Sequence, residues 1–403
     1  MPVLLIGTLD TKGAEYAFVR DLLRAGGVSP LVIDAGVTGP PFFEPDVPRE
    51  RLYAAAGTSL EAVRRANDRG KAIEAAALGA ARIVNEYANQ AEGILALGGS
   101  AGTTIGTAAM RALPFGIPKL MVSTLASGQV KQYVGVRDVL MMHSVVDISG
   151  LNRISRVVLT NAANAMIGMA KGQAHRSQPL GLTEKPLVTA TMFGVTTPCV
   201  EAARRLLEAS DYEVLVFHAT GTGGLTMESF VRDGLIRGVL DLTTTELADE
   251  LVGGVLTAGP DRLTAAGLCG VPQVISLGAL DMVNFGPPDT VPEKFRGRRF
   301  YQHNPTVTLM RTTPEENDRL GKEIAQKASA ARGPTAVLLP LRGVSAIDRA
   351  GQPFWWPEAD QALFQSLRNW MSPHVRLLEL DLHVNDAEFA GAAARTLLDF
   401  LSG

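Results

Sequence analysis

A stretch rich in glycine and hydroxyl side chains, Gly98-Gly99-Ser100-Ala101-Gly102-Thr103-Thr104, is the part of the sequence best suited to binding an anion. It follows an apolar run that predicts a strand, and it precedes a predicted helix. Glycines let a ligand approach the backbone closely, and the first N–H groups of a helix attract an anion. The stretch matches neither the dinucleotide fingerprint nor the Walker A motif. We predict an anion site for a nucleotide phosphate; the alternative is a purely structural tight turn.

A second stretch with suitable chemistry, Gly7-Thr8-Leu9-Asp10-Thr11-Lys12-Gly13, follows the first predicted strand. Ligands of open parallel sheets bind beyond the carboxyl ends of the strands. Lys12 would neutralise a phosphate, and Asp10 would hold Mg²⁺ or a ribose hydroxyl. A compatible alternative is that Asp10 or Thr11 caps the following helix. The residues predicted to bind the nucleotide, including two that end other strands, are Gly7, Thr8, Asp10, Lys12, Asp34, Gly98, Gly99, Ser100, Gly102, Thr103, Thr104 and Ser123.

The second half of the chain carries titratable side chains at the ends of several predicted strands. A histidine beside a Gly/Thr turn suits general acid–base chemistry, with the turn holding an anionic substrate group. The predicted catalytic residues are His218, Glu246, Asp281, His303 and His383. The predicted substrate-binding residues are Thr220, Gly221, Thr222, Gly223, Asn284 and Arg342. We expect them to converge on one cleft, although each could instead cap a helix or hold a turn. No zinc motif or nucleophile elbow is present, so no metal site is predicted.

The elements that would position these residues alternate between apolar strands and helices. In the first half, strands are expected at 3–8, 30–34, 93–97, 119–124 and 139–146, with helices at 14–25, 59–90, 107–113 and 151–171. A long Gly- and Pro-rich connection spans 36–58, and connections of this length are often functional. A second alternating set follows residue 187. This order predicts an α/β protein with two Rossmann-like domains, each a mostly parallel sheet flanked by helices.

Length and composition agree with two globular domains of an intracellular protein. The chain has 403 residues, of which 46% are hydrophobic and 20% charged. A polar stretch at 172–184 predicts the linker, so we expect a nucleotide-binding domain at 1–178 and a second domain with a substrate cleft at 179–403. The net charge of −3 does not favour nucleic acid or a membrane surface as a partner. Two cysteines and the lack of a signal peptide or apolar span predict a cytoplasmic location.

Several long motifs together resemble one protein family. They are 6–13, 98–103, Asp241-Leu242-Thr243-Thr244-Thr245-Glu246, 278–286, His303-Asn304-Pro305, 310–313 and Leu339-Pro340-Leu341-Arg342-Gly343. Along essentially its full length, the chain resembles the bacterial and plant family that includes the tomato mosaic virus resistance protein. This resemblance implies a two-domain α/β fold, ATP binding in the first domain, with or without Mg²⁺, and a homodimer. It implies no particular reaction.

Two functions remain open at this point. The first is a small-molecule enzyme that uses or senses ATP in its first domain and presents a polar cleft in its second. The second is a nucleotide-dependent regulatory or partner-binding protein without turnover. The titratable residues of the second half favour the enzyme. The lack of a recognisable nucleophile or metal motif favours the binding protein.

Overall fold

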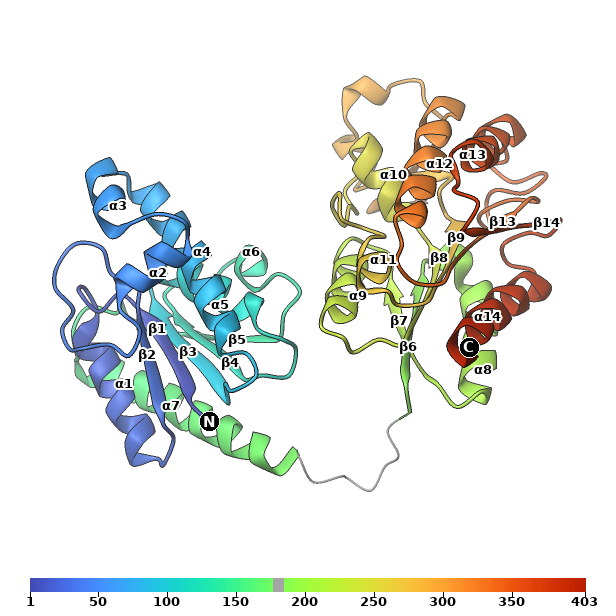
Figure 1. Ribbon diagram of the computed structural model, residues 1–403. Coiled ribbons are helices and arrows are strands. Elements are labelled where there is room, and N and C mark those ends of the chain that lie inside the picture. The colour runs from blue at the N-terminus through green and yellow to red at the C-terminus, as the bar shows by residue number, and fades with distance from the viewer. Residues whose placement is uncertain (177–184) are drawn as a thin grey trace. The chain divides into compact units, whose positions relative to one another are not determined.

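The structure is a computed structural model that describes residues 1–176 and 185–403. The chain divides into two compact units, unit 1 (Met1–Leu182) and unit 2 (Thr183–Gly403) (Figure 1). The predicted linker at 172–184 lies largely outside the described residues, as does the predicted boundary between residues 178 and 179. The helix before it continues to Arg176, further than predicted.

Unit 1 contains a five-stranded, wholly parallel sheet with the strand order β2-β1-β3-β4-β5. Its elements are β1 (Val3–Gly7), α1 (Gly13–Ala25), β2 (Pro30–Asp34), α2 (Arg49–Ala55), α3 (Leu60–Ala66), α4 (Arg69–Glu86), β3 (Gly93–Gly98), α5 (Ser100–Ala112), β4 (Lys119–Ser123), α6 (Lys131–Val134), β5 (Val139–His143) and α7 (Arg153–Arg176).

Both faces of this sheet are covered by helices, which explains why its inner strands read as continuous apolar runs. In β1, Leu4 and Ile6 pack in a core with α2, α3, α4 and α5. Val3 and Leu5, which point to the opposite face, pack in a second core with α1 and α7. Figure 1 shows these two helix layers on either side of the sheet.

Unit 2 contains a six-stranded, wholly parallel sheet with the order β14-β13-β9-β8-β6-β7. Its elements are β6 (Leu187–Met192), α8 (Thr197–Ala209), β7 (Glu213–His218), α9 (Thr222–Arg232), β8 (Gly238–Thr243), α10 (Thr245–Val252), α11 (Ala265–Cys269), β9 (Gln273–Gly278), β10 (Met282–Phe285), β11 (Phe300–Asn304), β12 (Val307–Arg311), α12 (Pro314–Ser329), β13 (Thr335–Pro340), α13 (Pro357–Trp370), β14 (Arg376–Leu380) and α14 (Ala387–Ser402).

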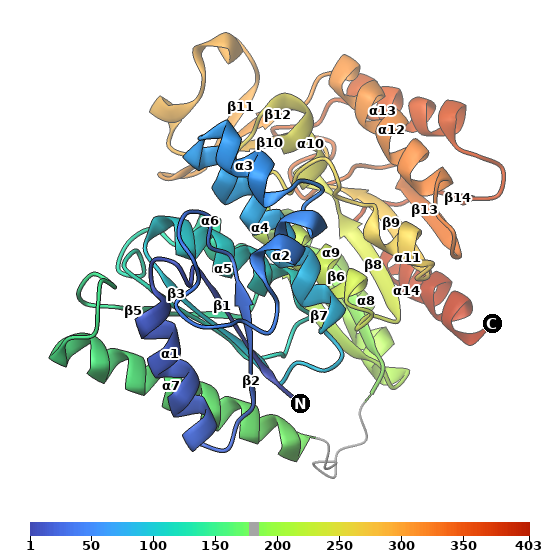
Figure 2. The same cartoon turned by 60° about the vertical axis from the view of Figure 1, so that its left-hand side comes forward.

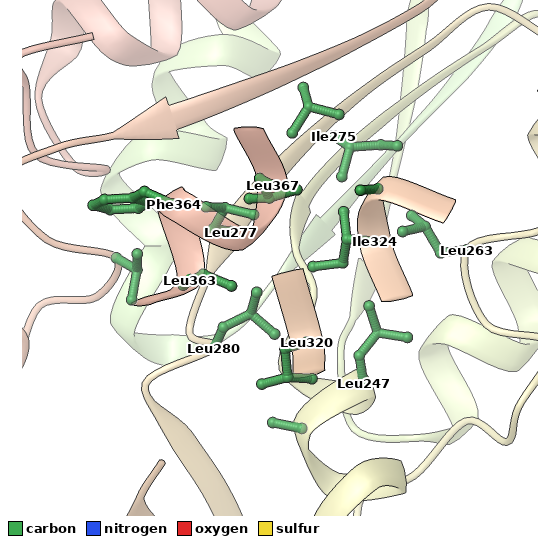
Figure 3. Packing of buried hydrophobic residues seen from close by; sticks show 14 of the residues in the cluster. Leu247, Leu263, Ile275, Leu277, Leu280, Leu320, Ile324, Leu363, Phe364 and Leu367 are labelled. Carbon is green, nitrogen blue, oxygen red and sulfur yellow. The ribbon is translucent and has the colours of Figure 1, made fainter. Parts of the chain in front are cut away.

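One core of unit 2 lies between the sheet and the helices α10, α12 and α13. Ile275 and Leu277 of β9 pack there with Leu320 and Ile324 of α12 and with residues of α13 (Figure 3). The opposite face of the sheet packs against α8 and α14. Figure 2 shows α8 and α14 beside the strands β6 and β8. The predicted fold class, two α/β domains with parallel sheets flanked by helices, is therefore confirmed.

Two parts of the prediction were incomplete. Unit 2 also carries a three-stranded antiparallel sheet with the order β10-β12-β11, which the sequence did not suggest. The short helices α2, α6, α10 and α11 were not predicted either, and α2 lies within the stretch that was expected to be a connection. Among the described residues, no helix combines the length and apolar character needed to cross a membrane.

The two glycine-rich stretches were expected to be turns, but much of each is helical. Helix α5 begins at Ser100 rather than at residue 107, and α9 begins at Thr222, inside the Gly/Thr turn. Glycine occupies these helix starts because a backbone carbonyl lies close to the place that a Cβ would take. A Cβ on Gly102 would lie 3.0 Å from the carbonyl oxygen of Leu97, and one on Gly223 would lie 1.7 Å from that of His218.

Candidate functional site

A cavity of about 670 Å³ opens at the carboxyl ends of β1 and β3 in unit 1. The chain continues from β1 to β2 on one side and returns to β3 on the other, so this is the point where the strand order reverses. Open α/β sheets bind their ligands at such a point. The cavity is lined by Thr8, Asp10, Thr11, Lys12, Ala35, Val37, Thr38, Tyr53, Val63, Arg64, Asn67, Asp68, Arg69, Ala72, Ile73, Ala76, Gly99, Ser100, Ala101, Gly102 and Ile105.

The N-terminus of α5 forms the part of the cavity that suits an anion. Gly99 is the N-cap residue, and no side chain caps this helix. The first intrahelical bond runs from the N–H of Thr103 to the carbonyl of Gly99. The amide groups of Ser100, Ala101 and Gly102 therefore have no protein acceptor among the described residues, as the first turn of an uncapped helix requires. Together with the helix dipole they can hold a phosphate.

Lys12 brings a positive charge to the same cavity. It is the N-cap residue of α1, and its Nζ donates a hydrogen bond to the carbonyl of Ile148. An ammonium group has three N–H donors. Ile148 supplies the one protein acceptor of Nζ in the part of the chain that the structure describes, so donors remain for an anionic ligand.

The other end of the cavity is apolar. Its wall comes from the stretch after β2 and from the helices α2 to α5, through Ala35, Val37, Tyr53, Val63, Ala72, Ile73, Ala76 and Ile105. Tyr53 is buried, and this burial raises the pKa of its hydroxyl to about 12, so the ring stays neutral. Polar side chains from the junction of α3 and α4 complete the lining. This combination of an apolar wall and an anion-binding end suits a nucleotide, with the base against the wall.

The loop that closes one side of the cavity is held by two carboxylates. Asp10 Oδ2 accepts hydrogen bonds from the N–H groups of Val37 (2.9 Å) and Thr38 (2.8 Å) and from the hydroxyl of Thr38. Burial raises the pKa of Asp10, but these hydrogen bonds outweigh burial and hold the pKa below its ordinary value. Asp34 accepts from the N–H groups of Leu9 and Gly36 and from Arg49 Nε (2.7 Å).

Six of the twelve residues predicted to bind the nucleotide line the cavity, namely Thr8, Asp10, Lys12, Gly99, Ser100 and Gly102. The others, Gly7, Asp34, Gly98, Thr103, Thr104 and Ser123, do not line it. Thr103 and Ser123 are buried and share a hydrogen bond of 2.7 Å that joins α5 to β4. The apolar wall and the α3–α4 junction were not foreseen as parts of the site. The long connection at 36–58, which supplies Val37, Thr38 and Tyr53, was the one signal for them.

The Gly/Thr turn before α9 in unit 2 already binds a carboxylate side chain of the protein. Glu246 Oε1 accepts hydrogen bonds from the N–H groups of Gly221 (2.7 Å) and Gly224 (3.0 Å) at the start of α9. Glu246 Oε2 pairs with Arg262 Nε at 2.7 Å. Arg262 also binds Asp241 at 2.7 Å, and all these side chains are buried. The turn 220–223, predicted to bind substrate, is thus an internal binding site for Glu246.

A second buried ionic cluster contains two more of the predicted catalytic residues. Asp281 Oδ2 accepts a hydrogen bond from the hydroxyl of Ser345 (2.8 Å), and the backbone carbonyl of Ser345 accepts one from His383 Nε2 (2.9 Å). Arg311 lies in the same cluster and pairs with Asp348 and Asp360. Burial raises the pKa of Asp281 to about 8 and lowers the pKa of His383. Both side chains are therefore near neutral at physiological pH, inside the core.

The remaining residues predicted in unit 2 lie elsewhere. His218 is exposed at the end of β7, at the opposite edge of the six-stranded sheet from β14, the strand that precedes His383. His303 is exposed in β11 of the separate antiparallel sheet. The structure thus brings Asp281 and His383 together, but neither His218 nor His303 joins them.

The two predicted substrate-binding side chains of unit 2 are also engaged within the protein. Arg342 forms a two-pronged pair with the exposed Asp381, at 2.8 and 2.7 Å. Asn284 is buried and donates to Asp249 Oδ2 at 2.6 Å. The residues nominated in unit 2 therefore occupy several separate places and do not form one cleft.

Comparisons with known proteins match both units. A model of the N-terminal domain of the Uncharacterised protein family (UPF0261) matches residues 1–175, and a model of its C-terminal domain matches residues 185–401. A UPF0261 protein of Clostridium tetani is 51% identical over 99% of this chain and 98% of its own length. A UPF0261 protein of Rhizobium meliloti is 47% identical over 98% of each chain.

A plant protein is similar over a shorter part. The ToMV resistance protein Tm-1(GCR237) of Solanum lycopersicum is 47% identical over 320 residues, which are 79% of this chain and 42% of that protein. This match covers less of the chain than the full length we expected, whereas the bacterial relatives span nearly all of it. The resemblance read from the motifs is confirmed. The chain belongs to the UPF0261 family, and both domains of that family are present in it.

Proposed function

We propose that unit 1 is a nucleotide-binding domain and that ATP is its ligand. The observation that carries this proposal is the uncapped N-terminus of α5, whose free amides line a cavity at the switch point of a parallel sheet. Lys12 adds a positive charge to the same cavity. In this arrangement the phosphates bind at residues 99–102 and Lys12, and the adenine base packs on the apolar wall.

The role that the geometry supports best is that of a nucleotide-dependent regulatory or partner-binding protein. An enzyme would need a second cleft with convergent titratable groups. In unit 2, Glu246, Asp281 and His383 instead bind other groups of the protein within the core. Such buried groups, engaged with other groups of the protein, are not placed to reach a substrate. The homodimer and the cytoplasmic location expected from the sequence remain predictions, and sedimentation analysis tests the first of them.

Calorimetric titration of the full chain with ATP, adenosine and inorganic phosphate tests the proposal. We expect ATP to bind and to raise the melting temperature. A ligand present at 100 times its Kd stabilises the folded state by about 2.7 kcal/mol. Adenosine and phosphate, which each fill one end of the cavity, should bind more weakly than ATP. The absence of any response to ATP in both calorimetry and thermal unfolding would reject nucleotide binding by unit 1.

A further inference from the structure

The charge of a bound nucleotide can be balanced by a Mg²⁺ ion or by positively charged protein groups. The hydrogen-bond partners of the carboxylates near the cavity distinguish these two cases. Proteins that bind a Mg²⁺–nucleotide usually hold the metal with one or two carboxylates in addition to the phosphates. Asp10 and Asp68 are the two acidic residues in the lining, and Asp34 ends the neighbouring strand. Whether these residues fit a Mg²⁺ ion can be judged from the partners of each oxygen.

In this structure neither oxygen of Asp10 is open to a metal, because Oδ2 is hydrogen-bonded and Oδ1 is buried. Its Oδ2 accepts three hydrogen bonds from Val37 and Thr38, and Arg49 lies 3.8 Å away. Its Oδ1 is buried without a hydrogen-bond partner and faces Gly36, where a Cβ would lie 2.7 Å from it. The carboxylate therefore points into the protein, and its charge serves to hold the loop after β2.

Both oxygens of Asp34 also have hydrogen-bond partners within the protein. Leu9 and Gly36 donate to its Oδ1, and Arg49 Nε donates to its Oδ2. Arg49 in turn donates to the carbonyl of Gly39 at 2.7 Å. Asp34, Arg49 and Asp10 thus form one buried unit that shapes the cavity wall, and a metal could bind Asp34 only by displacing Arg49 or these backbone groups.

Asp68 lies on the apolar side of the cavity and caps a helix. Its Oδ1 accepts the N–H of Lys71 at the start of α4, and its Oδ2 lies 3.9 Å from the Lys71 ammonium. The hydroxyls of Thr8 and Thr11, nearer the anion-binding end, are hydrogen-bonded to each other at 2.8 Å. Within the described residues, no group of three or more His, Cys, Asp or Glu side chains is placed to hold a metal.

Positive charge, in contrast, is available without a metal. The cavity is lined by three basic residues, Lys12, Arg64 and Arg69. Arg64 donates to the carbonyls of Val37 and Thr38, whereas the guanidinium of Arg69 has no protein partner among the residues that the structure describes. The amides at the start of α5 add a partial positive charge.

We propose that this site binds the nucleotide as the free polyphosphate anion, without a divalent cation coordinated by protein side chains. The inference rests on the proposed function of unit 1. It assigns the neutralisation of the phosphates to Lys12 and the α5 amides. Mg²⁺ bound to the phosphates would cancel part of the charge that these groups recognise, so it should not strengthen binding.

The test is calorimetric titration of the full chain with ATP in excess EDTA and again in excess MgCl₂. We expect the Kd in EDTA to equal or be lower than that in MgCl₂. A Kd that Mg²⁺ lowers by more than about threefold overturns the proposal. Binding in neither buffer rejects nucleotide binding itself, which keeps the failure of the two proposals distinguishable.

Two variants make the test specific. Lys12→Met should weaken binding more in EDTA than in MgCl₂, because the free polyphosphate depends more on the ammonium. Lys171→Ala, an exposed lysine of unit 1 outside the cavity, is the matched control and should change neither Kd. Asp68→Asn should leave the ratio of the two Kd values unchanged; a ratio that shifts by more than about threefold would show that this carboxylate takes part in metal binding and would overturn the proposal.

Discussion

Glu246 accepts the backbone N–H of Gly221 at 2.7 Å, so the N-terminus of α9 has a carboxylate of its own protein, whereas the first amides of α5 have no acceptor among the described residues. Both helices follow a parallel strand and a Gly/Thr-rich stretch, and both expose amides at their first turn. The difference is the side chain on α10, which reaches the start of α9 and is neutralised by Arg262. Of the two similar motifs, the one in unit 1 is therefore open to a ligand and the one in unit 2 is closed.

Glu246→Ala should destabilise unit 2 without affecting ATP binding. The substitution leaves two amides without an acceptor and removes one partner of the buried Arg262. Breaking a buried ion pair in this way costs about 3–5 kcal/mol. Chemical unfolding followed in unit 2, together with ATP titration, measures both effects.

Glu201, a half-exposed residue of α8 that pairs with Arg204, provides the matched control, since a surface pair contributes about 0–1 kcal/mol. Glu201→Ala should therefore unfold nearly as the wild type does. A stable Glu246→Ala protein that has lost a ligand-dependent property would contradict the structural role and restore Glu246 as a functional residue.

The strands could be predicted from the sequence because burial on both faces leaves an unmistakable apolar run. The strand at 30–34 was predicted with the bounds that the structure shows. The roles of the glycines could not be predicted in the same way. A glycine indicates that something approaches the backbone closely, but not whether it is a ligand, the carbonyl of Leu97 or the carboxylate of Glu246.

The apolar wall of the cavity was missed for a different reason. Its side chains come from the connection after β2 and from four helices, and only the tertiary fold brings them together. Apolar residues on helices predict a core, and the same pattern on α4 also supplies Ala72 and Ile73 to a cavity. The antiparallel sheet was missed because its strands carry polar residues, such as Gln302, His303 and Asn304 in β11, and leave no continuous apolar run.

Lys12→Ala should weaken ATP binding far more than adenosine binding. Lys12 lines the same cavity as the first residues of α5, and a charge-assisted hydrogen bond contributes about 1.5–3 kcal/mol, which corresponds to roughly 10- to 150-fold in Kd. Titration of both ligands into wild type and variant measures the difference. Equal losses for the two ligands would place Lys12 away from the phosphates.

The stability of unit 2 should fall as the pH rises from 7 to 9. Burial raises the pKa of Asp281 to about 8 and that of Asp360 to about 7, with Asp348 adding to both shifts. An aspartate of the unfolded chain has a pKa near 3.9, so the folded state binds more protons in this range. Its unfolding free energy then decreases with pH, by at most about 1.4 kcal/mol per pH unit for each proton.

The neutral variant Asp281→Asn tests this origin of the pH dependence. It keeps an acceptor for Ser345 and has no proton to lose, so its stability should fall less between pH 7 and 9. Burial lowers the pKa of the nearby His383, which therefore stays neutral above about pH 6.5 and does not contribute there. Urea unfolding at several pH values gives the slopes. Identical slopes for the variant and the wild type would refute the assignment to Asp281.

Gly99→Val should block nucleotide binding while leaving unit 1 folded. Gly99 lines the cavity as the N-cap of α5, with backbone angles φ −80° and ψ −154° that a valine can adopt. A Cβ there would have Thr124 Oγ1, at 3.7 Å, as its nearest neighbour, so the Cβ itself meets no backbone. We expect a loss of at least about tenfold in ATP affinity. The melting temperature should stay within about 2–4 °C, which corresponds to about 1 kcal/mol for a domain of this size.

Gly102 also lines the cavity, but a substitution there would not separate the loss of binding from a loss of stability. A Cβ on Gly102 would lie 3.0 Å from the carbonyl oxygen of Leu97, so Gly102→Val would push α5 away from β3 and lose stability as well as binding. Gly128→Val is the matched control, because a Cβ there has only the Leu125 carbonyl at 3.7 Å and the residue does not line the cavity. If Gly99→Val is folded and binds ATP as the wild type does, the phosphates do not bind at the start of α5. The nucleotide would then have to bind elsewhere in the protein, and the proposed site in unit 1 would be wrong.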